Sequence, residues 1–243
     1  MRTILNGLVY FIFAIISIPL YLIAWIIRLI NKKFAARLVQ YLVVGIFKTF
    51  LFLSGAKYII KGKENIPTDR PVLYAANHRS FFDIILAYAI VPTQTAFVAK
   101  KSIKKLPCVS QWMFFLNCLF LDRNDIKQGL QTILSAISLV KEGYSIYIAP
   151  EGTRNASDEL LPFKEGSLKI AQKGKCPIIP VALLGTEEIL ESHSPWIKKG
   201  KIAIIFGEPI NIDELSPEDK KHLGVYVREK VKALYEKNLP IIN

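Results

Sequence analysis

The chain has 243 residues, of which 51% are hydrophobic, so it can bury the core of one ordinary domain plus an appendage. Its 32 Lys and Arg against 20 Asp and Glu give a formal charge of +12, which favours an anionic partner such as nucleic acid, a phosphorylated substrate or acidic lipid. Three scattered cysteines argue against a disulfide framework and a zinc site, and the glycines form neither GxGxxG nor GxxxxGK[ST], so these nucleotide-binding loops are not supported.

The amino-terminal residues are much more apolar than the rest of the chain. Residues 3–27, 25 in all, carry no charge, and a run of this length is typical of a membrane-embedded helix. A second apolar segment, residues 34–55, is interrupted by Arg37 and Lys48, which fits an amphipathic helix in the headgroup region. The alternative is a buried helical hairpin of a soluble protein, but the first segment is long for such an element.

A basic turn between the two segments limits their topology. If both segments crossed the bilayer, Arg28, Lys32 and Lys33 would face outside, against the positive-inside tendency. This leaves a single span with the amino terminus outside, or a helical hairpin inserted in one leaflet. We favour the hairpin because Pro19 permits a bend. We expect residues 1–55 to form a membrane anchor and residues 56–243 to form a separate α/β domain.

After residue 55 the pattern changes to short β-rich runs that alternate with helical stretches. The strands are expected at residues 57–62, 71–77, 95–100, 118–123, 144–150, 177–185 and 201–207. The helices are expected at residues 80–90, 107–117, 124–143 with Asn124 or Asp125 as cap, 165–174, and from Ser216 through Asn238 as one last helix. This order predicts an α/β fold with a largely buried sheet.

The stretch "AANHRSFFDII" joins the second strand to its helix and contains a histidine and an aspartate. Ser80 and Asp83 form a capping box, which explains both residues without any catalysis. His78 has no such explanation, and the positive end of the helix dipole would keep it neutral and able to accept a proton. Asp83 can reach back to hold the other ring nitrogen, so the pair is a candidate His–Asp dyad.

Other charged side chains also follow the ends of strands. Glu151 and Arg154 flank a Gly-Thr turn after one strand, and this pairing of an acceptor with a bidentate donor suits a hydroxylated, phosphorylated ligand. Arg123 follows another strand, and Lys100 and Lys101 follow a third. Open α/β sheets place their ligand crevice at the carboxyl ends of the strands, so we expect these groups to share one rim with the dyad.

Four motifs in order give the chain a resemblance to the glycerolipid acyltransferase family, in particular to the bacterial 1-acylglycerol-3-phosphate acyltransferases. The family's NHxxxxD motif corresponds to Asn77, His78 and Asp83, and its GxxFxxR motif to Phe120 and Arg123. Its PEGTR motif corresponds to Pro150, Glu151, Gly152, Thr153 and Arg154, and its proline within an apolar strand to Pro180. Lys100 and Lys164 resemble the family's lysine elements, whereas Asn117 stands where the second motif usually has glycine. The match covers roughly residues 62–207.

The resemblance implies an α/β acyltransferase domain with a mixed sheet flanked by helices, attached by its amino-terminal helices to the inner membrane with the active site at the cytoplasmic face. It implies that His78, oriented by Asp83, removes the proton from the sn-2 hydroxyl of lysophosphatidic acid, which then attacks an acyl thioester of acyl carrier protein or coenzyme A. Lys100, Lys101, Arg123 and Arg154 would bind the phosphate, Glu151 the glycerol or the arginines, and Gly152 and Thr153 would complete that turn. Backbone N–H groups near Ser80 are oxyanion candidates. No cofactor and no metal are implied.

Several alternatives remain open or are weaker. Within the family, another lysophospholipid or glycerol-3-phosphate is an alternative acceptor. A non-catalytic lipid-binding membrane protein would keep the basic surface but would not need His78. A thiol enzyme using Cys108 or Cys118 is disfavoured because both lie in apolar runs, and a serine hydrolase using Ser80 lacks the GxSxG elbow. No nucleic-acid-binding motif is recognised, so we expect no nucleic-acid partner.

Overall fold

The computed structural model describes the whole chain except Ala156, Asp158 and Asn243. In this part of the chain, seven strands form one sheet in the order β1-β7-β6-β2-β5-β3-β4. The strands are β1 (Ala56–Lys61), β2 (Leu73–Ala76), β3 (Thr95–Lys100), β4 (Leu119–Leu121), β5 (Ser145–Ile148), β6 (Ile178–Leu184) and β7 (Gly200–Phe206). Neighbouring strands pair parallel except β6 with β7, which pair antiparallel. The predicted mixed sheet is therefore confirmed.

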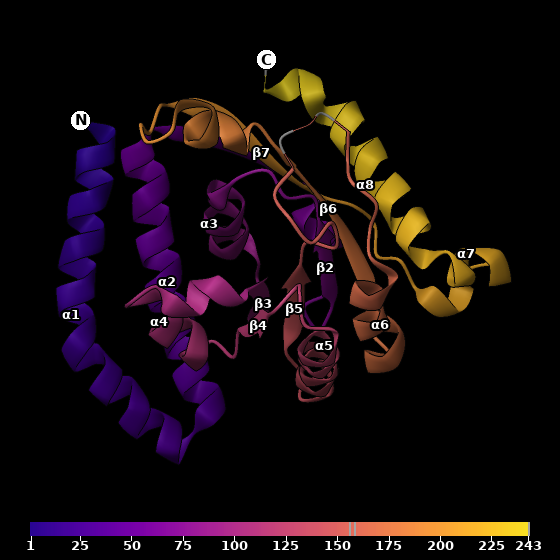
Figure 1. Cartoon of the computed structure of the whole chain (residues 1–243), viewed down its shortest axis with the longest axis horizontal. Coiled ribbons are helices and arrows are strands. Elements are labelled where there is room, and N and C mark those ends of the chain that lie inside the picture. The colour runs from indigo at the N-terminus through magenta and orange to yellow at the C-terminus, as the bar shows by residue number, and fades with distance from the viewer. Residues whose placement is uncertain (156, 158, 243) are drawn as a thin grey trace.

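Helices cover both faces of this sheet (Figure 1). They are α1 (Arg2–Ile30), α2 (Lys32–Ser54), α3 (Phe81–Ile90), α4 (Val109–Phe115), α5 (Ile126–Lys141), α6 (Glu165–Gly174), α7 (Pro217–Lys221) and α8 (Leu223–Asn238). The core on one face is shared by α1 to α4, and the core on the other face by α5, α6 and α8. The sheet is buried on both faces, which explains why its strands read as continuous apolar runs in the sequence.

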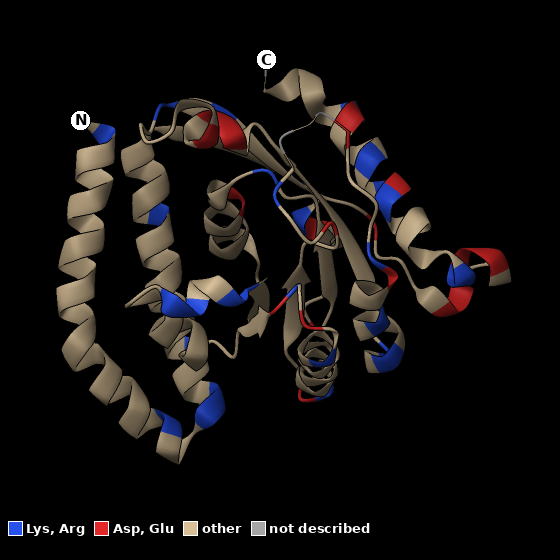
Figure 2. Ribbon diagram, in the orientation of Figure 1, with Lys and Arg blue, Asp and Glu red and all other residues tan. Residues whose placement is uncertain are grey.

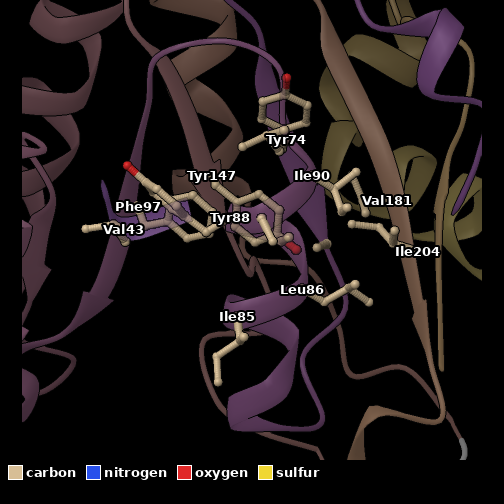
Figure 3. Packing of buried hydrophobic residues seen from close by; sticks show 14 of the residues in the cluster. Val43, Tyr74, Ile85, Leu86, Tyr88, Ile90, Phe97, Tyr147, Val181 and Ile204 are labelled. Atoms are coloured by element: carbon tan, nitrogen blue, oxygen red, sulfur yellow. The ribbon is translucent and has the colours of Figure 1, made fainter. Parts of the chain in front are cut away.

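Aromatic rings fix α3 against the sheet (Figure 3). Phe97 of β3 stacks on Tyr147 of β5 with ring centroids 4.4 Å apart, and Tyr88 of α3 lies 4.9 Å from Phe97. Val43 of α2 belongs to the same cluster, and Phe47 of α2 meets Tyr88 edge to face at 5.8 Å. The helix that follows His78 is therefore held from the sheet side by β3 and β5 and from the outer side by α2.

The two apolar segments form a helical hairpin along one side of the domain. Asn31 separates α1 from α2, and its side chain accepts the backbone N–H of Phe34 as an N-cap. α1 runs unbroken through Pro19 and curves around the domain in Figure 1, as a proline inside a helix allows. α2 ends at Gly55, whose φ of 73° suits glycine, and β1 begins at the next residue. The division of the chain into two domains at this point stays a prediction.

The last predicted helix is wrong in one respect, because it is two helices. Ser216 caps α7 by accepting the N–H of Asp219, but the chain leaves helical geometry at His222 and α8 begins afresh at Leu223. Gly224 donates its N–H to Glu165 at 2.7 Å, and a Cβ at Gly224 would lie 2.6 Å from the carbonyl oxygen of Phe163. The start of α8 therefore lies close to the start of α6, and α8 has a different direction from α7 in Figure 1.

Candidate active site

The dyad lies on the loop between β2 and α3, and that loop is anchored on both sides. Asn77 follows β2, and its amide group exchanges hydrogen bonds of 2.9 and 2.7 Å with the backbone of Leu183 in β6. At the other end, the capping box is present as predicted: Ser80 Oγ accepts the N–H of Phe82, and Asp83 accepts the N–H of Ser80. These local bonds fix the four residues that separate His78 from Asp83.

His78 and Asp83 are in contact. Asp83 Oδ2 accepts a hydrogen bond from His78 Nδ1 at 2.9 Å and from the N–H groups of Arg79 and Ser80 at 2.7 and 2.8 Å. The hydroxyl of Thr186 donates to its other oxygen, Oδ1. Because a carboxylate only accepts, Nδ1 is the protonated ring nitrogen and Nε2 is left with the lone pair. The ring is 17% exposed and the carboxylate is buried, so His78 can accept a proton from a ligand while Asp83 cannot be reached.

The expected oxyanion donors at the start of α3 are already engaged. The N–H of Ser80 points to Asp83, and the N–H of Phe82 points to Ser80 Oγ. The N–H of Phe81, which an isolated helix would leave free, donates to Glu191 Oε1 at 2.8 Å. The expectation that these groups form an oxyanion site is therefore wrong for this conformation, because each has a partner within the chain.

Glu151 faces inward instead of toward the predicted arginines. Its Oε1 accepts the backbone N–H of His78 at 2.9 Å, and its Oε2 accepts Leu161 N–H at 3.0 Å and Asn155 Nδ2 at 3.2 Å. Burial raises its pKa, while these hydrogen bonds oppose that effect. The carboxylate ties the loop after β5 to the loop after β2. A direct contact between Glu151 and a glycerol portion stays a prediction.

Two arginines follow strand ends, and one of them, Arg154, is joined to the start of α3 through Glu191. Burial lowers the pKa of Arg123, and the positive charge of Arg154 lowers it further. Arg154 is 58% exposed and its Nη1 donates to Glu191 Oε1 at 3.0 Å. The ammonium group of Lys164 lies over Gly152, where a Cβ would be 2.8 Å from Nζ. Gly152 has a φ of 76° and Thr153 is exposed on the same turn.

The two predicted lysines differ in their surroundings. Lys100 ends β3 opposite Leu121 of β4, which places it close in the sheet to the strand end that leads to Arg123. Lys101 pairs with Asp122 at 3.0 Å, so part of its charge is already balanced. Asn117, at the glycine position of the second motif, adopts a φ of 55°, so the backbone keeps the left-handed conformation that glycine would favour.

The connection between β6 and β7 also contributes residues that we did not predict. Thr186 contacts Asp83, Glu187 pairs with Arg79 at 2.9 Å, and Glu191 contacts the start of α3. β6 is parallel to β2, so its carboxyl end reaches the same edge of the sheet. The polar run "GTEEILES" after this strand was a signal of the kind that identified the other strand ends.

The rival nucleophiles fit the structure poorly. Burial raises the pKa of the Cys118 thiol to about 12, and its sulfur accepts the N–H of Phe97 at 3.4 Å. The Ser80 hydroxyl is buried and donates to Glu191 Oε2 at 2.5 Å. A thiolate at Cys118 and an accessible alkoxide at Ser80 are both disfavoured, whereas the His78 ring is accessible and oriented.

Comparison with known proteins identifies the family. The acyltransferase family model matches residues 57–184, which is more than half of the chain. The chain is 34% identical to the 1-acyl-sn-glycerol-3-phosphate acyltransferase of Bacillus subtilis, over 68% of this chain and 78% of that protein. It is 32% identical to the enzyme of that name from Cocos nucifera over 79% of this chain, but covers only 61% of that longer protein.

The fold of a solved relative agrees with these matches. The crystal structure of PlsC, the 1-acyl-sn-glycerophosphate (LPA) acyltransferase from Thermotoga maritima, superposes with a TM-score of 0.78 and 30% sequence identity. The superposition covers 98% of this chain and 97% of that one, so the likeness includes the amino-terminal hairpin as well as the sheet. The family match contains all the residues of the dyad loop and of the arginine pair. The chain belongs to the acyltransferase family.

Proposed function

We propose that this protein transfers an acyl chain from a thioester to the sn-2 hydroxyl of 1-acyl-sn-glycerol 3-phosphate, giving phosphatidic acid for phospholipid synthesis. The observation that carries the proposal is the His78–Asp83 pair with its free Nε2, on the same loop that Glu191 joins to Arg154, whose charge also acts on Arg123. A base linked in this way to cationic side chains suits an acceptor that carries a hydroxyl and a phosphate on neighbouring carbons. The names of the relatives agree with this acceptor.

In the proposed reaction, Nε2 of His78 takes the hydroxyl proton as the acceptor oxygen attacks the thioester carbonyl carbon. Asp83 stabilises the imidazolium that forms, through the bond at Nδ1. Collapse of the tetrahedral intermediate breaks the carbon–sulfur bond, and the proton passes from His78 to the departing thiolate. General-base catalysis contributes about 10²- to 10⁴-fold, and holding the two substrates together must supply much of the rest.

The cations would hold the phosphate and the chain needs no cofactor for this chemistry. Arg123 and Arg154 are the first candidates, with Lys100 and Lys164 near the same rim and Lys101 shared with Asp122. The donor would be acyl carrier protein or coenzyme A, both of which carry the acyl group as a thioester. Gly152 and Thr153 would let the phosphate approach the backbone of the turn after β5.

We propose further that the hairpin lies in one leaflet and does not cross the membrane. α1 contacts the α/β domain near both of its ends: Thr3 Oγ1 accepts the N–H of Ile197 at 2.8 Å, and Arg28 stacks on Phe114 at 4.7 Å. These two residues are 25 positions apart, which in a helix spans about 38 Å, more than the hydrocarbon thickness of about 30 Å. A crossing helix would therefore carry the adjoining domain, with its charged surface, into the hydrocarbon.

The polar contacts between these ends support the same orientation. Ser17, in the middle of α1, accepts the indole N–H of Trp112 at 2.9 Å, and Tyr21 donates to the carbonyl oxygen of Cys108 at 3.0 Å. The hairpin exposes many apolar side chains, which include Ile4, Leu8, Phe11, Ile15, Ile18, Ile26, Phe34, Leu38 and Tyr41. Figure 2 shows Lys and Arg gathered at the hairpin turn and none along the middle of α1. This distribution suits insertion from an anionic, cytoplasmic membrane surface.

The deciding experiment is an acyl-transfer assay on the purified full chain in mixed micelles. The acceptors are lysophosphatidic acid, uncharged-headgroup and zwitterionic lysolipids, and glycerol 3-phosphate, each offered with an acyl carrier protein thioester and a coenzyme A thioester. We expect phosphatidic acid from lysophosphatidic acid, and no turnover by His78→Ala although that variant stays membrane-bound. Preference for another acceptor would correct the substrate, and absence of transfer with every pair would contradict the activity.

A further inference from the structure

The connection between β6 and β7 holds the dyad loop through three side chains. Thr186 donates its hydroxyl hydrogen to Asp83, and Glu187 forms an ion pair with Arg79, with Oε1 and Nε 2.9 Å apart. Glu191, one turn further along, contacts both the start of α3 and Arg154. The connection between β6 and β7 therefore links the loop of His78 to the loop that carries Arg154, the candidate phosphate ligand. This connection lies outside the four motifs that gave the family resemblance.

Glu191 makes three hydrogen bonds, which join the start of α3 to Arg154. Its Oε1 accepts the N–H of Phe81 at 2.8 Å and Nη1 of Arg154 at 3.0 Å, and its Oε2 accepts the hydroxyl of Ser80 at 2.5 Å. The side chain is only 25% exposed. A carboxylate is favourable at this place because the first turn of a helix carries partial positive charge. Glu191 thus joins an exposed arginine to the start of α3.

The contact with Glu191 restricts the side chain of Arg154. Its side chain is 58% exposed on a loop, and a free arginine side chain loses about 2 kcal/mol of rotamer entropy when a ligand orders it. The positive charge of Arg123 also repels it. Glu191 offsets that repulsion, and its contact uses one of the five N–H donors of the guanidinium. The remaining donors keep the planar fork that binds phosphate.

We propose that Glu191 is a positioning residue that selects phosphorylated acceptors, by holding Arg154 at a set distance from the start of α3 and so from His78. This rests on the proposed role of Arg154 as a phosphate ligand. Because a phosphate and a hydroxyl on adjacent carbons have a limited range of separations, a fixed arginine places the hydroxyl near Nε2. An acceptor without phosphate gains nothing from this arrangement.

Glu191→Gln tests the proposal with little change of shape. The amide keeps an oxygen for the N–H of Phe81 but loses the charge that holds Arg154, and charge-assisted hydrogen bonds are roughly twice as strong as neutral ones. We expect the ratio of kcat/KM for lysophosphatidic acid to that for a monoacylglycerol of the same chain to fall about five- to tenfold, mostly through the KM of the phosphorylated acceptor. The control is Glu188→Gln, whose carboxylate is 57% exposed and contacts His193 and Ser192; its ratio should be unchanged.

A second measurement does not depend on the reaction. Phenylglyoxal modifies exposed guanidinium groups, and the rate at Arg154 can be followed by mass spectrometry on the whole chain in detergent. Release from Glu191 should make Arg154 react faster in Glu191→Gln than in Glu188→Gln. This comparison tests whether Glu191 holds Arg154 even if the wild-type protein shows no preference for a phosphorylated acceptor. That lack of preference would contradict the proposed substrate. An unchanged acceptor ratio, an equal loss for both acceptors, or equal modification rates would overturn the inference.

Discussion

Replacing Asp83 by asparagine separates the charge of this residue from its shape. Oδ2 accepts two backbone N–H groups as well as His78 Nδ1, so in the variant the carbonyl oxygen must occupy this position. The amide nitrogen then faces Thr186, whose hydroxyl can turn to accept a hydrogen bond. The ring of His78 therefore keeps its orientation and its proton on Nδ1, and only the negative charge is lost.

The expected loss of rate follows from this geometry. Two unit charges about 4 Å apart, at an effective dielectric constant of about 20, attract each other by about 4 kcal/mol. The amide dipole retains part of that attraction for the imidazolium, which leaves about 2–3 kcal/mol lost in the transition state. At 1.36 kcal/mol per tenfold change, kcat should fall about 30- to 150-fold. The loss should appear in kcat and leave the KM for lysophosphatidic acid nearly unchanged, because Asp83 touches no substrate.

Steady-state kinetics of Asp83→Asn beside His78→Ala test the prediction, with thermal unfolding in detergent to show that both variants fold. A loss of less than threefold would mean that the imidazolium does not need the carboxylate. A loss as large as that of His78→Ala would mean that the dyad had been disassembled, and would refute the argument that the two backbone N–H groups fix the orientation of the side chain.

Two further predictions concern stability and topology. Thr186→Val leaves a buried carboxylate oxygen of Asp83 without its donor and should lower the free energy of unfolding by about 1.5–3 kcal/mol. Thr186→Ser keeps the hydroxyl and should retain most of the stability. Equal unfolding temperatures for wild type and Thr186→Val would contradict the assignment of this bond. For the hairpin, an epitope tag before Met1 and a cysteine at Lys33→Cys should both be accessible only from the cytoplasmic side of sealed vesicles. Opposite accessibility would show a single span.

The dyad could be predicted from the sequence because the interactions that build it are local. Ser80 and Asp83 lie one helical turn apart, so the capping box follows from spacing alone, and His78 immediately precedes it. The electrostatic influence of Arg154 on Arg123 required only that parallel strands end at one edge of a sheet. In both cases the relevant distance is set by regular secondary structure, whose geometry is known before the fold is.

The engaged N–H groups could not be predicted in the same way. Glu191 is 111 residues from Ser80, and its contact with α3 depends on the path of the irregular segment between β6 and β7. The inward orientation of Glu151 has a similar origin, since its partners include the N–H of Leu161 beyond a long loop. Hydrophobic periodicity does not predict which side chains cap the backbone of another element. A run of polar residues after a strand indicates only the segment that contains them.

The packing of α2 on α3 connects the proposed membrane hairpin to the loop that carries His78. Phe47 and Val43 of α2 contact the aromatic cluster around Tyr88, so the helix that carries Asp83 has a fixed orientation relative to the hairpin. With the hairpin in one leaflet, a lysolipid can present its headgroup to His78 while its chain stays in apolar surroundings. Full transfer of that chain to water would cost about 0.8 kcal/mol per CH₂, or roughly 12 kcal/mol for a chain of about 15 such groups. A dyad held at a set position above the leaflet avoids this cost, and for that reason we expect the hairpin to act on the acceptor's access to the site as well as on attachment.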